Sequence, residues 1–158
     1  MDKILKLGNP LLYQVSKPVL QSEIPHLKPQ VDLLQDLILE VRKIHGFGRG
    51  IAAPQIGLMK RLFCLNIDGQ KTTLYNPKLT HLSDEMFELW DDCMCFPNLL
   101  VKVNRHVHCK VSFKDENWQD HTWELTEDLS ELVQHEYDHL DGILATQRAI
   151  DDRSFRVK

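Results

Sequence analysis

The stretch QHEYDHLDG, residues 134–142, carries two histidines four positions apart, with a glutamate directly after the first. Positions i and i+4 share one face of a helix, so His135 and His139 can direct their imidazoles at one metal ion. Glu136 then lies to one side, where it can reach a water molecule on that ion without being a ligand. The pattern is typical of a metal-assisted hydrolytic site. The alternative is a solvated polar helix face.

Two histidines leave such a site incomplete, because catalytic zinc-like centres use three protein ligands and one open position. No histidine follows His139, and Asp141 and Asp151 are the main acids downstream. Upstream, Cys93 in the stretch WDDCMCFP is the better candidate, since a thiolate binds soft and borderline dications strongly. Its plain alternative is a small buried apolar residue.

A helix must hold the two histidines in this relation. Thr126 is expected as its N-cap, and Glu127 and Asp128 follow in the first turn, where the helix dipole favours acidic side chains. The helix should run to about Leu140, and Gly142 marks its end. The motif is therefore predicted to lie on a capped helix.

A second helix is predicted nearer the N-terminus. Residues 1–28 contain three prolines and are expected to form an extended, turn-rich arm. A helix should begin at Pro29, which suits a first turn, and end at Gly46. Its apolar residues recur at three- and four-residue spacing: Val31, Leu34, Ile38 and Val41.

The remaining elements read as strands. They cover residues 61–67, 72–82, 106–113 and 118–125. Asp68 and Gly69 would form the turn between the first two strands, and residues 115–117 the turn between the last two. In the third strand, alternate residues from Val107 to Phe113 would share one face. The expected class is α+β, with antiparallel strands surrounding a central helix.

Composition narrows the function further. The chain has 158 residues, enough for one domain with its own core, and a net charge of −4 with a pI near 6.0. It has no long basic run, which argues against nucleic acid or an acidic membrane surface as the main partner. No apolar stretch approaches 18 residues and no secretory signal is evident, so a cytoplasmic protein is expected. Four cysteines in a reducing compartment indicate metal binding or catalysis more than disulfides.

Three motifs occur in a particular order: GRGIAAPQ at 48–55, DDCMC at 91–95 and HEYDH at 135–139. In order and spacing they resemble the peptide deformylases, and the opening ILKLGNPLLYQVSKPV at 4–19 is similar to the start of that family. The resemblance covers nearly the whole chain. It implies a single domain over 1–158, with antiparallel sheets surrounding the central HExxH helix and a helix near the N-terminus.

The resemblance also implies a metal centre. One divalent ion, usually iron(II) with zinc, nickel or cobalt as substitutes, would be held by Cys93, His135 and His139. The substrate would be an N-formylated peptide or nascent chain, met near the ribosome exit region, and the product would be formate. Glu136 would take a proton from the attacking water and pass it to the leaving amine.

Two further residues would stabilise the oxyanion in this family: the side chain of Gln55 and the backbone N–H of Met94. Gly48 and Gly50 would let the loop backbone approach the peptide, which would pair with it as an added strand.

The second motif departs from the usual family pattern E-G-C-L-S. Asp91 keeps the acid with one methylene fewer, and Asp92 adds a charge where glycine is usual. Met94 replaces leucine. Cys95 replaces serine; on an extended segment it would share a face with Cys93, where it could pack, ligate or become an oxidation partner.

The side-chain pocket departs as well. Leu89 and Leu132 remain apolar, but charged residues stand where aliphatic or small ones are usual. These are Arg49, Asp92, Asp128 and Glu131. One hypothesis is that the enzyme prefers a substrate other than an ordinary formyl-methionine peptide. The other is that these side chains turn to solvent and methionine still fits.

Several alternatives stay open. Asp138 could orient a ligand histidine or be a plain solvated acid, and His106 with His108 could bind metal or lie on a solvent-facing strand. A zinc endopeptidase could use the same helix, although no further ligand follows it. A degenerate relative could bind metal or formylated chains without turnover, although Gln55 and the whole HExxH motif are intact.

Overall fold

The computed structural model describes residues 3–158; residues 1–2, which the sequence assigned to the arm and the domain, lie outside the described part. Two long helices and eight strands follow one another along the chain. They are α1 (Ile24–His45), β1 (Gly50–Ala52), β2 (Leu62–Ile67), β3 (Gln70–Thr80), β4 (Met86–Asp92), β5 (Leu99–His106), β6 (His108–Lys114), β7 (Asp120–Thr126), α2 (Glu127–Leu140) and β8 (Phe155–Val157).

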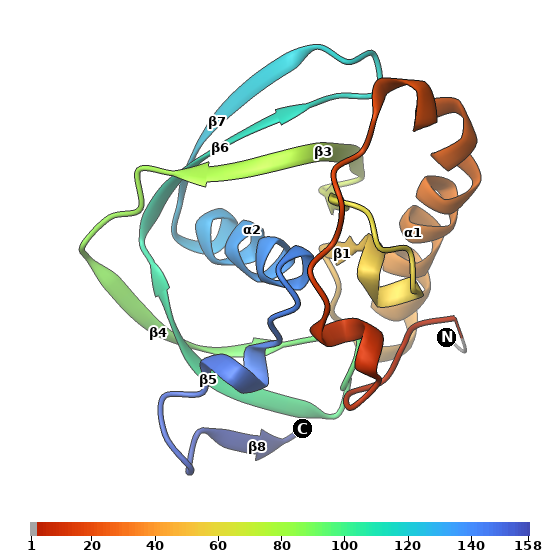
Figure 1. Cartoon of the computed structure of the whole chain (residues 1–158). Helices are drawn as coiled ribbons and strands as arrows, with labels where there is room; N and C mark the ends of the chain where they lie inside the picture. Colours follow the sequence, from red (N-terminus) through yellow and green to blue (C-terminus); the bar gives the residue numbers. More distant parts are fainter. Residues whose placement is uncertain (1–2) are drawn as a thin grey trace.

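Two antiparallel sheets enclose α2, with β3, β6 and β7 on one side of it and β4 and β5 on the other (Figure 1). The five-stranded sheet has the order β1-β2-β3-β6-β7, and the three-stranded sheet has the order β4-β5-β8. Every paired strand in both sheets is antiparallel. The predicted α+β class, with sheets around the helix that carries the histidines, is confirmed.

Strand β2 separates the two parts of the core. Leu62 and Cys64 pack in the cluster that contains the buried face of α1, whereas Phe63 and Leu65 pack in the cluster around α2. Successive side chains of a strand point to opposite faces, so both faces of β2 are covered. This explains why β2 reads as a continuous apolar run rather than as an alternating one.

Helix α1 begins five residues earlier than the sequence predicted. Pro25 occupies its first turn, where a missing N–H costs nothing, and Pro29 lies inside the helix. The predicted start at Pro29 was wrong because one lost hydrogen bond so close to the helix start is outweighed by packing of the apolar face. The helix ends as expected, with Gly46 in the left-handed conformation. In the described part of the chain, no helix has both the length and the apolar character needed to cross a membrane.

The two predicted hairpins are present, but the strand over 106–113 is not continuous. Ile67 pairs with Gln70 across the Asp68-Gly69 turn, as expected. The chain leaves β5 after His106 and enters β6 at His108, so Val107 lies between two strands of different sheets. Strands β4 and β5 were missed; β4 has only one buried residue, Asp91, and shows no clear alternation of apolar residues.

Candidate active site

Helix α2 places its motif inside the molecule. It runs from Glu127 to Leu140 as predicted, with Thr126 at the N-cap, although the Thr126 side chain makes no capping hydrogen bond. His135, Glu136 and His139 are all buried. The alternative of a solvated helix face is therefore wrong.

The end of β4 brings a cysteine to the two histidines. Cys93, His135 and His139 each offer one ligand atom, and these atoms lie within 4.8 Å of one another. Cys93 Sγ is 3.4 Å from His139 Nε2. Within residues 3–158 this is the only group of three or more side chains that could hold a metal ion, so neither His106 nor His108 belongs to one.

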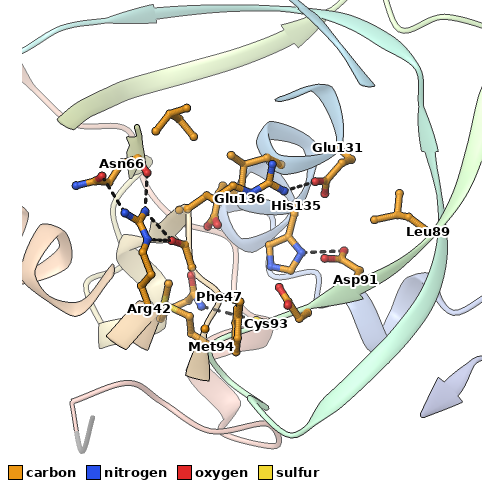
Figure 2. A pocket seen from close by; sticks show the side chains of 18 of the residues that line it. Arg42, Phe47, Asn66, Leu89, Asp91, Cys93, Met94, Glu131, His135 and Glu136 are labelled. Atoms are coloured by element: carbon orange, nitrogen blue, oxygen red, sulfur yellow. Dashed lines mark hydrogen bonds and ion pairs between the residues drawn. The ribbon is translucent and has the colours of Figure 1, made fainter. Parts of the chain in front are cut away.

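Asp91 fixes the orientation of the first histidine. Its Oδ2 accepts from His135 Nδ1 at 2.9 Å (Figure 2), which leaves Nε2 as the ring nitrogen available to a metal ion. Burial alone would lower the pKa of His135, but the Asp91 carboxylate raises it to about 9. Burial opposes the charge of Asp91 too, yet His135 and Arg105 hold the pKa of Asp91 at about 2. An ion that binds here would displace the proton of His135.

The donor set fits a divalent metal ion. Burial raises the pKa of the Cys93 thiol well above its usual value and lowers that of His139 well below its own. His139 is therefore neutral, as a metal ligand must be, and its Nδ1 has no hydrogen-bond partner among the described residues. An ion that displaces the protons of Cys93 and His135 would meet a thiolate and two neutral imidazoles, the ligands that borderline dications prefer.

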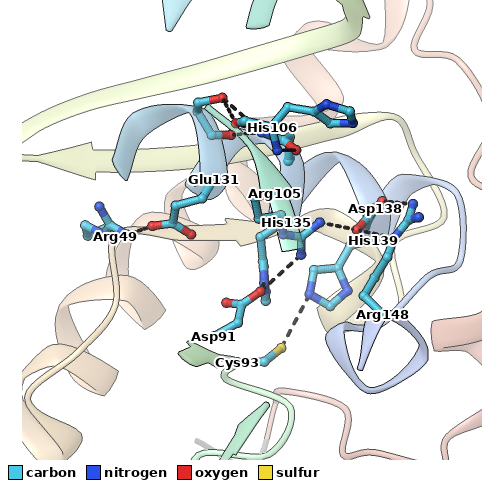
Figure 3. A network of polar contacts seen from close by, with 12 residues as sticks. Arg49, Asp91, Cys93, Arg105, His106, Glu131, His135, Asp138, His139 and Arg148 are labelled. Atoms are coloured by element: carbon cyan, nitrogen blue, oxygen red, sulfur yellow. Dashed lines mark hydrogen bonds and ion pairs between the residues drawn. The ribbon is translucent and has the colours of Figure 1, made fainter. Parts of the chain in front are cut away.

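A buried ion-pair network lies behind these ligands (Figure 3). Arg105 donates to Asp91 Oδ2 at 3.0 Å and to Asp138 Oδ2 at 2.6 Å, and Arg148 donates to Asp138 at 2.8 and 3.1 Å. Asp138 thus contacts two arginines and no histidine, and it is buried. Of the two alternatives for Asp138, the plain solvated acid is wrong, whereas orientation of a ligand histidine is compatible with the structure, although not by a direct bond. It supports His135 only through Arg105 and Asp91.

The sequence analysis overlooked Arg105, although one signal was present. Val101, Val103 and Arg105 are alternate residues of β5, and all three are buried. A charged residue in the inward series of a strand requires buried partners of opposite charge.

Glu136 lies against the glycine of β1. A Cβ atom at Gly50 would come within 2.7 Å of Glu136 Oε1, so only glycine allows this approach. Burial raises the pKa of Glu136 to about 7. Its other oxygen, Oε2, is buried without a hydrogen-bond partner in residues 3–158. A carboxylate with such a pKa and a free oxygen can exchange a proton near neutral pH.

Gln55 is held with its amide nitrogen toward the cysteines. Its Oε1 accepts from Ala52 N at 2.8 Å, while its Nε2 lies 3.7 Å from Cys93 Sγ and 3.4 Å from Cys95 Sγ. Residues 93–95 form a turn, in which Phe96 N donates to Cys93 O, so the expected extended segment is wrong. Cys95 is buried, contacts Gln55 and lies outside the group of potential metal ligands.

A cavity of about 570 Å³ opens beside the three ligands (Figure 2). The residues that the sequence assigned to substrate binding all line it, together with Met94. They are Gly48, Arg49, Gly50, Leu89, Asp92, Glu131 and Leu132. The sequence missed Phe47, Trp90 and Arg42, which also line it. Arg42 donates to Gly48 O at 3.0 and 2.8 Å and thereby fixes the glycine loop.

Three of the charged residues that line this cavity, Arg49, Glu131 and Asp92, form ion pairs. Arg49 forms ion pairs with Glu131 and with Asp128, and Asp92 accepts from Lys158 Nζ at 3.1 Å. Asp128 does turn to solvent, as one hypothesis held, but Glu131 is buried. The departures from the family pattern therefore alter the cavity itself.

Comparison with known proteins gives one consistent result. The family model described as polypeptide deformylase matches residues 1–154. The peptide deformylase of Leptospira biflexa is 34% identical over 97% of this chain and 90% of its own length. That of Treponema pallidum is 34% identical over 93% of this chain and 86% of its own length.

Solved structures agree with this result. An Arabidopsis thaliana peptide deformylase 1B in complex with an inhibitor matches with a TM-score of 0.85 and 28% identity, over 96% of this chain and 83% of that one. A peptide deformylase from Synechococcus elongatus in complex with actinonin matches with a TM-score of 0.82 and 29% identity, over 94% of this chain and 79% of that one.

Proposed function

Because the chain belongs to the polypeptide deformylase family, we propose that it is a metal-dependent hydrolase that removes the N-formyl group from nascent peptides and releases formate. Residues 1–158 would form one domain of this kind. The observation that carries the proposal is the position of Glu136, a buried carboxylate with one free oxygen, beside Cys93, His135 and His139.

One divalent ion would be held by Cys93, His135 and His139. Iron(II) is the ion that we propose, with zinc, nickel and cobalt as substitutes, since a thiolate with two imidazoles accepts all of them. When bound, the ion would polarise the attacking water and lower its pKa toward neutrality. Asp91 would keep His135 Nε2 directed at the ion through the bond to Nδ1.

Side-chain and backbone groups of the chain would transfer the proton of the attacking water and stabilise the negative charge that forms on the formyl oxygen. Glu136 would accept a proton as the water oxygen bonds to the formyl carbon, and would donate it to the amine nitrogen as the carbon–nitrogen bond breaks. The Nε2–H of Gln55 and the backbone N–H of Met94 would donate to the oxyanion that forms on the formyl group. Gln55 is prepared for this role because the bond from Ala52 N holds its Oε1.

The edges of the two sheets offer a place for the peptide. β1 and β4 are the edge strands of the five-stranded and three-stranded sheets, and both line the cavity. An extended peptide would add to the β1 edge as a further strand, next to Gly50. Such a substrate is a nascent chain that emerges from the ribosome, which would place the enzyme near the exit region in the cytoplasm.

Formate release from a formyl-methionine tripeptide tests the proposal. Protein loaded with iron(II) or nickel(II) without oxygen should release formate and leave a peptide that has lost only its formyl group. Chelator-treated protein should be inactive until metal is added back. Cleavage inside the peptide would instead indicate an endopeptidase, and bound metal without any product would indicate a binding protein.

A further inference from the structure

An ion pair in the cavity lining, between Arg49 and Glu131, lies about one helical turn from His135. Glu131 precedes His135 by four residues and therefore shares its face of α2. Arg49, from the loop that leads into β1, reaches across to Glu131 (Figure 3). Both side chains line the cavity in which the formylated residue would be held.

The two partners differ in solvent exposure and in the number of their ion-pair partners. The Glu131 side chain is 10% exposed, whereas that of Arg49 is 40% exposed. Arg49 also has a second acceptor, Asp128 Oδ2 at 3.3 Å, whose side chain is 75% exposed. Arg49 can therefore give up Glu131 and remain paired, but Glu131 cannot leave the cavity.

Arg49 does not fully compensate the charge of Glu131. Burial raises the pKa of Glu131 although the charge of Arg49 lowers it, and the nearby carboxylate of Asp91 adds to the rise. A second cation at Glu131 would be favourable. An anion would meet two carboxylates in the cavity lining, those of Glu131 and Asp92.

The rest of the wall suits a long side chain. Leu89 projects from β4 and lines the cavity (Figure 2), as does Leu132, which follows Glu131 on α2. Leucine side chains can cover an aliphatic stem whose charged end lies further along. Apolar surface and a buried carboxylate thus line the same cavity.

We propose that this cavity selects a formylated residue with a long cationic side chain, of the lysine or arginine class, for which Glu131 is the counter-charge and Arg49 the displaceable partner. The inference rests on the proposed deformylase function and goes further by naming the substrate class. A neutral side chain leaves the Arg49–Glu131 pair intact and gains nothing from it.

Initial rates on four peptides test the inference: formyl-lysine, formyl-norleucine, formyl-methionine and formyl-glutamate, each followed by the same two residues. Norleucine has the four-carbon stem of lysine without the ammonium group. The expected kcat/KM for formyl-lysine is at least about tenfold that for formyl-norleucine, with formyl-glutamate lowest.

Variants test whether the preference for lysine depends on Glu131. For each protein, kcat/KM for formyl-lysine is divided by kcat/KM for formyl-norleucine, so that a general loss of activity cancels. Glu131→Gln should bring the ratio to about one, because the counter-charge is gone. Arg49→Met should raise the ratio, because the competing cation is gone. Glu124→Gln makes the same change at an exposed ion pair on β7 and should leave the ratio as it is.

The outcomes separate the two proposals. Formate from formyl-norleucine or formyl-methionine at rates equal to or above formyl-lysine would overturn the cationic pocket and leave the deformylase function standing. A preference for formyl-glutamate would overturn it as well. No formate from any of the four peptides, with one metal ion per chain, would overturn the deformylase function and the inference with it.

Discussion

The two halves of helix α2 hold ion pairs in opposite settings. In the C-terminal half, Asp138 is bound to Arg105, whose side chain is 3% exposed and which also holds Asp91. In the N-terminal half, Glu131 is bound to Arg49, whose side chain reaches solvent. In the first network the buried Arg105 joins Asp138 to Asp91 and thereby fixes the geometry of His135, while the exposed Arg148 pairs only with Asp138. The second contains an arginine that can exchange partners, as a site for a variable substrate requires.

The largest difference in stability is expected between the variants that remove Arg105 and Arg49. Arg105→Met removes the buried cation that Asp91 and Asp138 share, leaves them only His135 and Arg148, and should lower the free energy of unfolding by about 3–5 kcal/mol. Arg49→Met should lower it by about 1 kcal/mol, because Asp128 is exposed and Glu131 can take up a proton. Urea unfolding of the metal-free proteins measures both values, and equal losses would contradict the distinction.

The metal centre should depend on the buried network alone. Asp91→Asn keeps the shape of the side chain but weakens the bond that orients His135, and should lower metal affinity by about 10- to 100-fold. Asp92→Asn, at the next position, changes a residue that pairs with Lys158 and should leave affinity unchanged. Competition with a chromogenic chelator gives both affinities; similar losses would show that general charge near the site is what matters.

The pKa of Asp91 is lowered and that of Glu131 is raised, so these two carboxyl groups should affect the stability of the protein with opposite dependence on pH. The pKa of Asp91 is lowered to about 2, so its stabilisation is present above its usual value of 3.8 and is lost as the pH falls through about 2. This shift corresponds to about 2 kcal/mol at neutral pH. The pKa of Glu131 is raised above 4.5, so its contribution is present below pH 4.5 and is lost as the pH rises through the folded-state pKa.

Thermal unfolding of the metal-free variants between pH 3 and pH 7 tests these signs. Asp91→Asn should destabilise more at pH 6 than at pH 3. Glu131→Gln should become more favourable relative to the unchanged protein as the pH rises. If the changes in unfolding temperature of the two variants varied with pH in the same direction, the opposite pKa shifts of Asp91 and Glu131 would be contradicted.

The smallest effect is expected at the exposed end of the second network. Asp128→Asn removes a surface acceptor of Arg49 and should change the free energy of unfolding by less than about 1 kcal/mol. Added salt should reduce the difference further, because the pair is screened. A loss comparable to that of Arg105→Met would mean that Arg49 is not free to exchange partners.

Much of the site could be predicted because its residues follow local rules. The spacing of His135 and His139 needs only helix geometry, and the thiol chemistry of Cys93 needs only its residue type. Asp138 could not be interpreted locally, since its partners Arg105 and Arg148 come from other elements. The setting of Glu131 likewise depends on Arg49, 82 positions away in the sequence.

The fold shows the same limit. The hairpin at Asp68 and Gly69 is encoded by its turn residues, and α2 by its periodicity and its acidic first turn. The start of α1 depended on tertiary packing that outweighed Pro29. Strand β4 carries too few buried residues to produce a pattern, although it positions Asp91 and Cys93.

The central claim is that Glu136 carries the proton in removal of the formyl group. The most direct measurement is formate release by the unchanged protein and by Glu136→Gln at equal metal content, with a formylated peptide that the unchanged protein turns over. Glutamine keeps the size of the side chain but cannot accept the proton, so the rate should fall at least about 10²-fold while metal binding persists. Equal rates at equal metal content would contradict the account.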